Sequence, residues 1–145
     1  MRLLAILIAC FAAPVANAWE TPRQALNEFL QFELEGGRLE SWPFKKYLAV
    51  GPDYDEPGWD EIELIQDVKV LPLTCDKTQC KAPVEITLTA TGGENFQQVT
   101  PHPNGGKETV TYVVVLRKGQ WLLASSNGKP RVSYAAFKRR YPNGL

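Results

Sequence analysis

Residues 108–123 read ETVTYVVVLRKGQWLL, and their pattern is the clearest fold signal in the chain. Glu108–Arg117 alternates apolar and polar side chains as a strand does, and the extra valines make its second face partly apolar. A strand with two apolar faces is expected at the centre of a sheet. Arg117-Lys118-Gly119-Gln120 predicts a hairpin turn, and Trp121–Ser125 its partner strand.

Two earlier runs predict further strands. From Glu61 to Leu73 apolar residues recur at alternate positions, with Gln66-Asp67 as a bulge or a break and Pro72 as a sign of an irregular or edge strand. Val84 to Ala90 alternates cleanly, which predicts a strand with one buried face. We expect the two runs to form a hairpin.

The segment before these strands predicts a helix. Thr21 can be the N-cap, Pro22 suits the first helical position and Gln24 completes a capping box. Apolar residues follow at helical spacing, and Gly36-Gly37 ends the helix. The predicted buried stripe is Ala25, Leu26, Phe29, Leu30 and Leu34, with Glu28, Gln31, Glu33 and Glu35 facing water.

The remaining segments are less regular. Arg38 to Val50 predicts a second, shorter helix with Pro43 near its start, and Gly51 to Trp59 a turn-rich loop. Thr91 to Lys107 predicts a long loop with a short strand at Phe96 to Val99. Ser133 is the expected cap of a C-terminal helix over Tyr134 to Phe137, with Lys138, Arg139 and Arg140 in its last turn.

This order of elements predicts an α+β fold with N-terminal helices packed on a curved antiparallel sheet. The chain resembles the nuclear transport factor two-like (cystatin-like) superfold in two stretches, Thr21–Leu30 and Tyr112–Leu123. The resemblance implies a cone-shaped sheet that wraps helices around an apolar pocket. It implies no single function, because that fold carries enzymes, binding proteins and interaction modules.

The first residues predict export. Arg2 precedes an apolar run from Leu3 to Ala13, and Ala16-Asn17-Ala18 fits a cleavage site before Trp19. The run is too short to span a bilayer, so we expect a signal peptide at 1–18 and a single α+β domain at 19–145, without stable membrane insertion. An alternative is a lipobox at Leu7–Cys10, which would anchor the protein through an acylated Cys10.

Charge is balanced overall but unevenly distributed. The chain has 16 basic and 16 acidic residues, which argues against nucleic acid as a partner. Trp19 to Asp67 carries a net charge of −8, and Val68 to Leu145 a net charge of +7. We expect the two halves to pair with each other; the alternative is a dipolar surface that steers a charged partner.

Cys75 and Cys80 remain after the expected cleavage and are predicted to form a disulfide in an oxidising compartment. A redox pair would favour two intervening residues, whereas four intervene here. A metal site would need further His or Cys ligands nearby, and the sequence offers none. The pair should lie at the tip of the hairpin formed by the first two strand runs.

Catalytic and cofactor motifs are absent from the sequence. The single histidine, His102, lies in a glycine-rich loop and is expected to be exposed. The serines lack a nucleophile context, and the glycine pairs lack a phosphate-loop lysine. The acidic run Asp53–Glu56 does not follow calcium-loop spacing and is expected to be solvated. We therefore predict no catalytic residues, no metal and no cofactor.

The last signal is an aromatic cluster within 18 positions: Trp42, Phe44, Tyr47, Tyr54 and Trp59. These side chains either pack in the core or form a binding patch for a ligand or protein partner. We expect a periplasmic or secreted, non-enzymatic module that binds a protein or a small apolar ligand. The alternatives are a small enzyme acting on an apolar substrate, which a buried carboxylate such as Glu63 or Glu85 would favour, and an envelope assembly factor or inhibitor protein.

Overall fold

The computed structural model describes residues 19–40, 43–56, 58–93, 99–102 and 105–143, so the predicted signal peptide and Trp42 lie outside the described residues. Its helical elements are α1 (Pro22–Leu34), η1 (Gly37–Leu39), η2 (Pro43–Tyr47) and α2 (Tyr134–Arg140). Its strands are β1 (Ile62–Val70), β2 (Thr74–Cys75), β3 (Gln79–Gly92), β4 (Val99–Pro101), β5 (Lys107–Arg117), β6 (Gln120–Leu123) and β7 (Arg131–Ser133).

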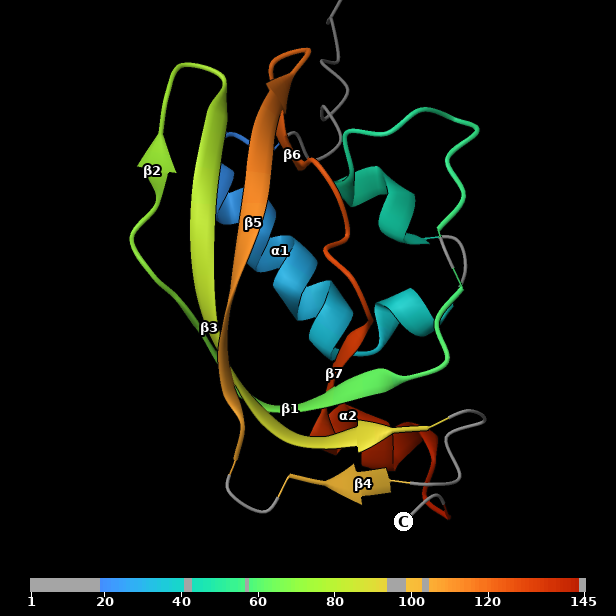
Figure 1. Ribbon diagram of the computed structural model, residues 1–145. Helices are drawn as coiled ribbons and strands as arrows, with labels where there is room; N and C mark the ends of the chain where they lie inside the picture. The colour runs from blue at the N-terminus through green and yellow to red at the C-terminus, as the bar shows by residue number, and fades with distance from the viewer. Residues whose placement is uncertain (1–18, 41–42, 57, 94–98, 103–104, 144–145) are drawn as a thin grey trace, which may run out of the picture.

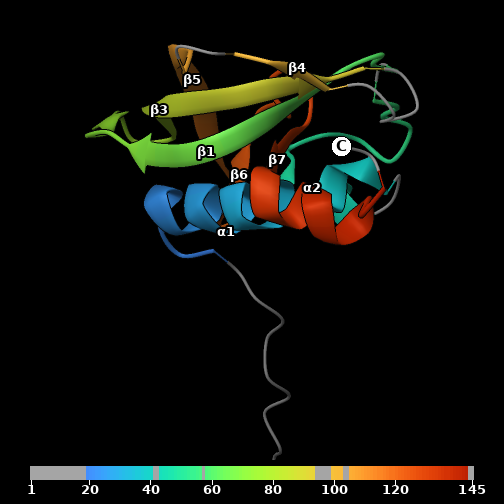
Figure 2. The same ribbon diagram turned by 90° about the horizontal axis from the view of Figure 1, so that it is seen from below.

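The architecture is α+β, as predicted: a curled sheet forms a half-barrel around α1 (Figure 1). The strand order is β6-β5-β3-β1-β7, with β2 and β4 also paired to β3. Seen from below, α1 and α2 lie on the same side of the sheet (Figure 2). No helix among the described residues is long and apolar enough to cross a membrane.

The sheet is mixed, whereas we expected it to be antiparallel throughout. β7 pairs in parallel with β1, through Glu63 with Arg131 and Ile65 with Ser133. β7 could not be predicted, because its three residues are too few to show a period of two. The parallel pairing in turn requires a long crossover, which the chain supplies by running through β2 to β6 between the two strands.

The predicted hairpins are confirmed. β1 and β3 are antiparallel, with a bulge at Gln66, and β5 and β6 pair across the turn at Lys118-Gly119. β2 pairs Cys75 with Cys80 of β3, and the two sulfurs are bonded at 2.09 Å. The disulfide therefore closes the tip of the hairpin, and it indicates an oxidising compartment.

Helix α1 begins as predicted, because Thr21 Oγ1 accepts from the Gln24 N–H at 3.1 Å. One prediction for its surface is wrong: Glu33 is buried rather than facing water. Glu33 follows Leu26 by seven positions and Phe29 by four, so it lies on the same stripe as the apolar residues. Its carboxylate can occupy that stripe because a buried arginine meets it there, as described below.

The predicted helix over Arg38–Val50 is also wrong. The structure has two separate 3₁₀ turns, η1 and η2, and Pro43, which has no N–H to donate to a continuing helix, stands at the start of the second. After η2 the chain extends along β6, where the Ala49 N–H donates to Leu123 O at 2.7 Å. This segment therefore covers the outer edge of β6.

The predicted loop over Thr91–Lys107 is shorter than expected. Its first two residues belong to β3 and its last to β5, and β4 pairs with β3 inside it. Of the strand predicted at Phe96–Val99, only Val99 lies within the described residues, and it begins β4. The partner strand expected at Trp121–Ser125 ends at Leu123, so Ser125 lies beyond it.

Two clusters of buried side chains form the core. The larger fills the space between α1 and the concave face of the sheet, with Phe29, Tyr47, Tyr112 and Leu123 among its members. The smaller lies beneath α2 and includes Ile62, Val132 and Phe137. Ser133 Oγ accepts from the Ala136 N–H at 3.1 Å and caps α2, as predicted.

Candidate functional site

The end of α1 that faces η1 carries a group of buried charges, which we call the buried ion network. Glu33 and Arg38 are each 1% exposed and Arg131 is 6% exposed. The other members, which contact these two arginines or Glu33, are Glu56, Glu63, Glu108 and Tyr112. Buried charges of this kind are stable only when paired and hydrogen-bonded.

Arg38 is the centre of one half of this network. Its guanidinium donates to Glu33 Oε1 at 2.5 Å and also pairs with the Glu56 carboxylate. It donates as well to three backbone carbonyls of one connection between β6 and β7: Ser126 O at 3.2 Å, Gly128 O at 2.5 Å and Lys129 O at 3.2 Å. A single buried side chain therefore joins α1, the β6–β7 connection and the loop between η2 and β1. We call this loop the acidic loop, after its acidic run Asp53–Glu56.

Arg131 is the centre of the other half. Its Nε lies 2.9 Å from Glu63 Oε2 on β1, and its guanidinium donates to Tyr112 Oη on β5 at 3.3 Å. A longer ion pair of 3.6 Å reaches Glu108, also on β5. The Arg131 N–H donates to Glu33 Oε1 at 3.3 Å, which connects the two halves. Arg131 thus bridges β7 to β5 across the open side of the half-barrel.

The β6–β7 connection is shaped by Asn127 and Gly128. Both have positive φ, 63° and 88°, a backbone conformation that asparagine and glycine adopt most readily. In this conformation Ser126 to Lys129 direct their carbonyls inward, and Asn127 O accepts from Arg131 at 3.0 Å. The Asn127 side chain donates to Thr111 O at 2.9 Å, which fixes the connection to β5.

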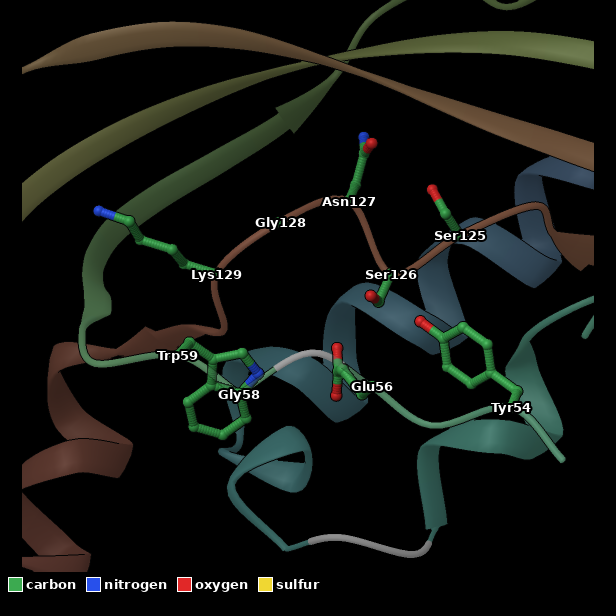
Figure 3. Close-up of a pocket in the computed structure, with 9 residues that line it drawn as sticks. All are labelled: Tyr54, Glu56, Gly58, Trp59, Ser125, Ser126, Asn127, Gly128 and Lys129. Atoms are coloured by element: carbon green, nitrogen blue, oxygen red, sulfur yellow. The ribbon is translucent and has the colours of Figure 1, made fainter.

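Beside the buried ion network is a cavity of about 420 Å³. One wall is the acidic loop and the other is the β6–β7 connection; the lining residues are Tyr54, Glu56, Gly58, Trp59, Ser125, Ser126, Asn127, Gly128 and Lys129. Figure 3 shows Tyr54 and Trp59 at the two sides of the cavity, with Glu56 between them and Ser126 facing Glu56. Aromatic walls with a few polar groups are typical of small-molecule sites.

The structure separates the predicted aromatic patch. Phe44 and Tyr47 are buried in the larger core cluster, 2% and 6% exposed. Tyr54 and Trp59 are partly exposed and line the cavity. Trp42 lies outside the described residues. Two of the five predicted residues therefore reach the cavity, one from each core cluster.

Burial changes the acidity of several groups in the network. Desolvation raises the pKa of Glu33, and the nearby guanidiniums of Arg38 and Arg131 oppose that rise. Desolvation likewise raises the pKa of Glu63, with Arg131 opposing and Glu108 adding to the rise. The pKa of Tyr112 is raised by burial and by the Glu33 carboxylate, so its hydroxyl stays neutral and can donate to Glu33.

His102 and Asp76 belong neither to the buried ion network nor to the lining of the cavity. The expectation that His102 is exposed is wrong: it is partly buried, and its Nε2 lies 2.7 Å from Thr91 Oγ1. Asp76 accepts from the N–H groups of Thr78 and Gln79 in the β2–β3 turn, and these bonds lower its pKa. Within the described ranges, no group of three or more His, Cys, Asp or Glu side chains is placed to hold a metal ion.

The two oppositely charged halves of the chain pair with each other, as expected. Four ion pairs join an acid from before Val68 to a base after it: Glu35–Arg139, Glu40–Arg140, Glu61–Lys129 and Glu63–Arg131. Arg139 and Arg140 in the last turn of α2 thus meet Glu35, the C-cap of α1, and Glu40, the residue after η1. Much of the charge asymmetry read from the sequence is therefore neutralised within the molecule.

The sequence analysis did not single out Arg38, Arg131 or Ser126 for the site. The spacing of Glu33 on the apolar stripe and the Asn127-Gly128 turn signal were both available in the sequence. Arg131 had no local signal, because the Glu33 carboxylate bonded to its N–H lies 98 positions away. Arg38 lies only five positions from Glu33, but its other partners are 18 to 91 positions away.

Comparison of the chain with protein-family models, with curated proteins and with solved structures returned no significant match. The site must therefore be interpreted from its own geometry.

Proposed function

We propose that this protein is an exported, non-enzymatic binding module that holds a small ligand in the cavity between the acidic loop and the β6–β7 connection. The observation that carries the proposal is the position of Arg38, which binds both walls of that cavity from behind. Walls held in place before the ligand arrives lose little conformational entropy when it binds.

The lining supports a particular class of ligand. Tyr54 and Trp59 offer ring faces for an apolar ring of the ligand, and the groups between them are polar. Lys129 contributes a cation at the rim, where its ammonium pairs with Glu61 and both side chains are about half exposed. A ligand with one flat apolar ring and one anionic or hydrogen-bonding group fits this arrangement, and the volume suits a molecule of about two rings.

A binding role is favoured over catalysis by the state of the buried carboxylates. Glu33 and Glu63 both have a raised pKa, as catalytic acids often do, but each is paired with a guanidinium. Neither lines the cavity, and the carboxylate that does, Glu56, is paired with Arg38. A general acid or base must reach its substrate, so these two groups are better explained as structural. Glu85, the other carboxylate considered, lies on β3 beside Lys69 of β1 and is also outside the cavity.

The proposed location rests on the disulfide and on the first 18 residues. The Cys75–Cys80 bond suits an oxidising, exported compartment, and Met1 to Ala18 has the layout of a signal peptide. We propose that the protein is periplasmic or secreted. We also propose, as a separate point, that its fold belongs to the nuclear transport factor two-like cones. An intact mass of the exported protein tests the location: it distinguishes cleavage after Ala18 from acylation at Cys10.

The ligand proposal can be tested with 1-anilinonaphthalene-8-sulfonate, which carries an aromatic ring system and an anion. We expect saturable binding with one site per chain, measured as a rise in probe fluorescence. Trp59→Ala and Tyr54→Ala should each weaken binding about tenfold, since each removes one aromatic wall. Trp121→Ala is the matched control, because it removes a partly exposed indole on β6.

Circular dichroism must show that each variant is folded. Equal affinity of wild type, W59A and Y54A would show that the cavity is not the binding site. Binding by W121A that is as weak as that of W59A would point to a general loss of structure.

A further inference from the structure

One edge of the sheet is covered over only part of its length. β7 pairs with β1 from Glu63 to Ile65 and then turns into α2 at Ser133. β1 continues to Val70, with β3 as its partner on the other side. Among the described residues no strand pairs with 66–70 on the side where β7 pairs with 63–65, so this part of β1 is an open strand edge.

The backbone groups of this edge are available for pairing. The Leu71 N–H donates to Pro83 O, which directs residue 71 toward β3. Alternate residues of a strand direct their N–H and C=O groups to the same side, so Val68 and Val70 direct theirs away from β3. An unpaired edge of this kind is a template for another strand.

The open edge carries apolar side chains on its inner face and charged side chains on its outer face. Val68 and Val70 lie across from the buried Ile86 and Val84 of β3, so they face α1. Asp67 and Lys69 are exposed on the opposite, outer face. Beneath the edge, a groove of about 420 Å³ runs between β1 and α1, and its lining includes Leu30, Leu34, Val68 and Val70.

We propose that a second copy of this chain pairs with this edge, β1 against β1 in antiparallel orientation, about a two-fold axis at Val68. Asp67 then lies directly opposite the partner's Lys69, and Lys69 opposite the partner's Asp67. The two Val68 residues exchange both of their backbone hydrogen bonds at the axis. This inference concerns a different surface from the ligand cavity and does not depend on it.

Charge complementarity favours a second copy as the occupant. A two-fold interface uses the same patch on both subunits, so the patch must complement itself. An acid and a base placed symmetrically about Val68 meet this condition. Directly opposite cross-strand pairs of opposite charge stabilise a sheet, whereas like charges destabilise it.

The same charges select the register. Moving the two-fold axis to Asp67 would place two aspartates opposite each other, and moving it to Lys69 would oppose two lysines. β7 and the start of α2 limit the pairing at one end, so the partner strand can occupy residues 66–70 only. The bulge at Gln66 and the short length predict a weak dimer, because both reduce regular pairing.

Charge reversal tests the proposal by sedimentation equilibrium of the disulfide-bonded protein. Wild type should show a concentration-dependent dimer. Asp67→Lys and Lys69→Asp should each weaken self-association about tenfold, since each variant opposes like charges twice. The double variant Asp67→Lys/Lys69→Asp should dimerise like wild type, because it exchanges the two charges.

A mixture of the two single variants gives the sharpest result. D67K carries two lysines and K69D two aspartates, so the mixed dimer restores both opposite-charge pairs. We expect the equimolar mixture to dimerise about as tightly as wild type, whereas each variant alone should dimerise about tenfold more weakly. Lys77→Asp in the exposed β2–β3 turn is the control and should leave the dimer unchanged.

Two outcomes would overturn the proposal. Wild type that stays monomeric up to millimolar concentration shows that this edge does not pair. A wild-type dimer that survives in D67K and K69D alike shows that another surface forms it.

Discussion

The two ends of α1 are held by different kinds of contact. Trp19, just before the helix, stacks on Tyr47 with ring centroids 5.0 Å apart, and Phe29, near the middle of the helix, meets Tyr47 edge-on at 5.9 Å. Near its C-terminus, Glu33 meets Arg38 and the N–H of Arg131. We call these the aromatic end and the ionic end. Both are buried, yet only the ionic end adjoins the cavity lined by Tyr54 and Trp59.

The difference shows what each kind of contact can hold. Aromatic packing buries side chains but supplies no hydrogen bonds to the backbone N–H and C=O groups of a loop. At the ionic end, two guanidiniums supply donors to the carbonyls of the β6–β7 connection, which has no regular structure. A binding surface can therefore be built on irregular backbone when a buried arginine fixes that backbone.

The largest effects are expected from removing the central residue of each end. Arg38→Ala leaves Glu33 and Glu56 without their shared cation and should cost about 3–5 kcal/mol of the free energy of unfolding. Phe29→Ala leaves a cavity at a fully buried position and should cost a similar amount, about 3–5 kcal/mol. Urea denaturation followed by circular dichroism measures both.

Hydrogen exchange then separates the two ends. In R38A, the amides of residues 126–129 should exchange faster than in F29A at equal global stability. Only R38A removes the guanidinium that donates hydrogen bonds to the carbonyls of this segment. Equal exchange in the two variants would mean that Arg38 does not order the β6–β7 connection.

A smaller effect is expected at the hairpin tip beyond the aromatic end. Cys75→Ser/Cys80→Ser opens a short loop, so the chain-entropy contribution lost is about 2 kcal/mol. The stability of the variant should equal that of wild type measured in reductant. A loss well above this value would show that the disulfide also maintains the pairing of β2 with β3.

The ionic end should give stability an unusual pH dependence. Burial raises the pKa of Glu33 above its ordinary value of 4.5, so the folded state holds this proton more tightly than the unfolded state does. Stability from Glu33 is therefore full below that ordinary value and falls as pH rises toward the raised pKa.

Glu33→Gln removes this ionisation and isolates its contribution. The free energy of unfolding of wild type minus that of E33Q should decrease as pH rises from about 4 to 7, whatever the offset between the two proteins. An increase over the same range would show that Arg38 keeps the pKa of Glu33 low.

The smallest effect is expected for ion pairs on the surface. Arg139→Ala breaks the pair with Glu35, in which the two side chains are 62% and 63% exposed. Exposed pairs are screened by water, so the loss should be less than about 0.5 kcal/mol. Thermal denaturation of R139A beside R38A gives this contrast. A cost above 1 kcal/mol for R139A would mean that α2 depends on this pair for docking.

The parts of the fold that could be predicted are those specified by local pattern. Helix α1, the β5–β6 hairpin and the cap at Ser133 follow from spacing and capping within a few residues. The disulfide follows from cysteine number and separation. In each case, the residues that determine the element lie inside it or next to it.

The parts that could not be predicted depend on distant partners. β7 is recognisable only once β1 is in place, since its three residues form no period of their own. Glu33 lies on the apolar stripe, but its hydrogen bond to the Arg131 N–H, 98 positions away, has no signal in the sequence. The cavity combines Tyr54, Glu56, Gly58 and Trp59 with residues 125–129, so the aromatic cluster alone indicated only half of it.

The parallel pair of β1 and β7 has a consequence for the order of folding. β1 lies in the middle of the chain, but the strand that covers its first residues is the last to be synthesised. The Glu33 carboxylate also cannot accept its hydrogen bond from the Arg131 N–H until that residue has been synthesised. A chain that emerges N-terminus first therefore stays incomplete until nearly all of it has appeared, and early segments remain open to chaperones until then.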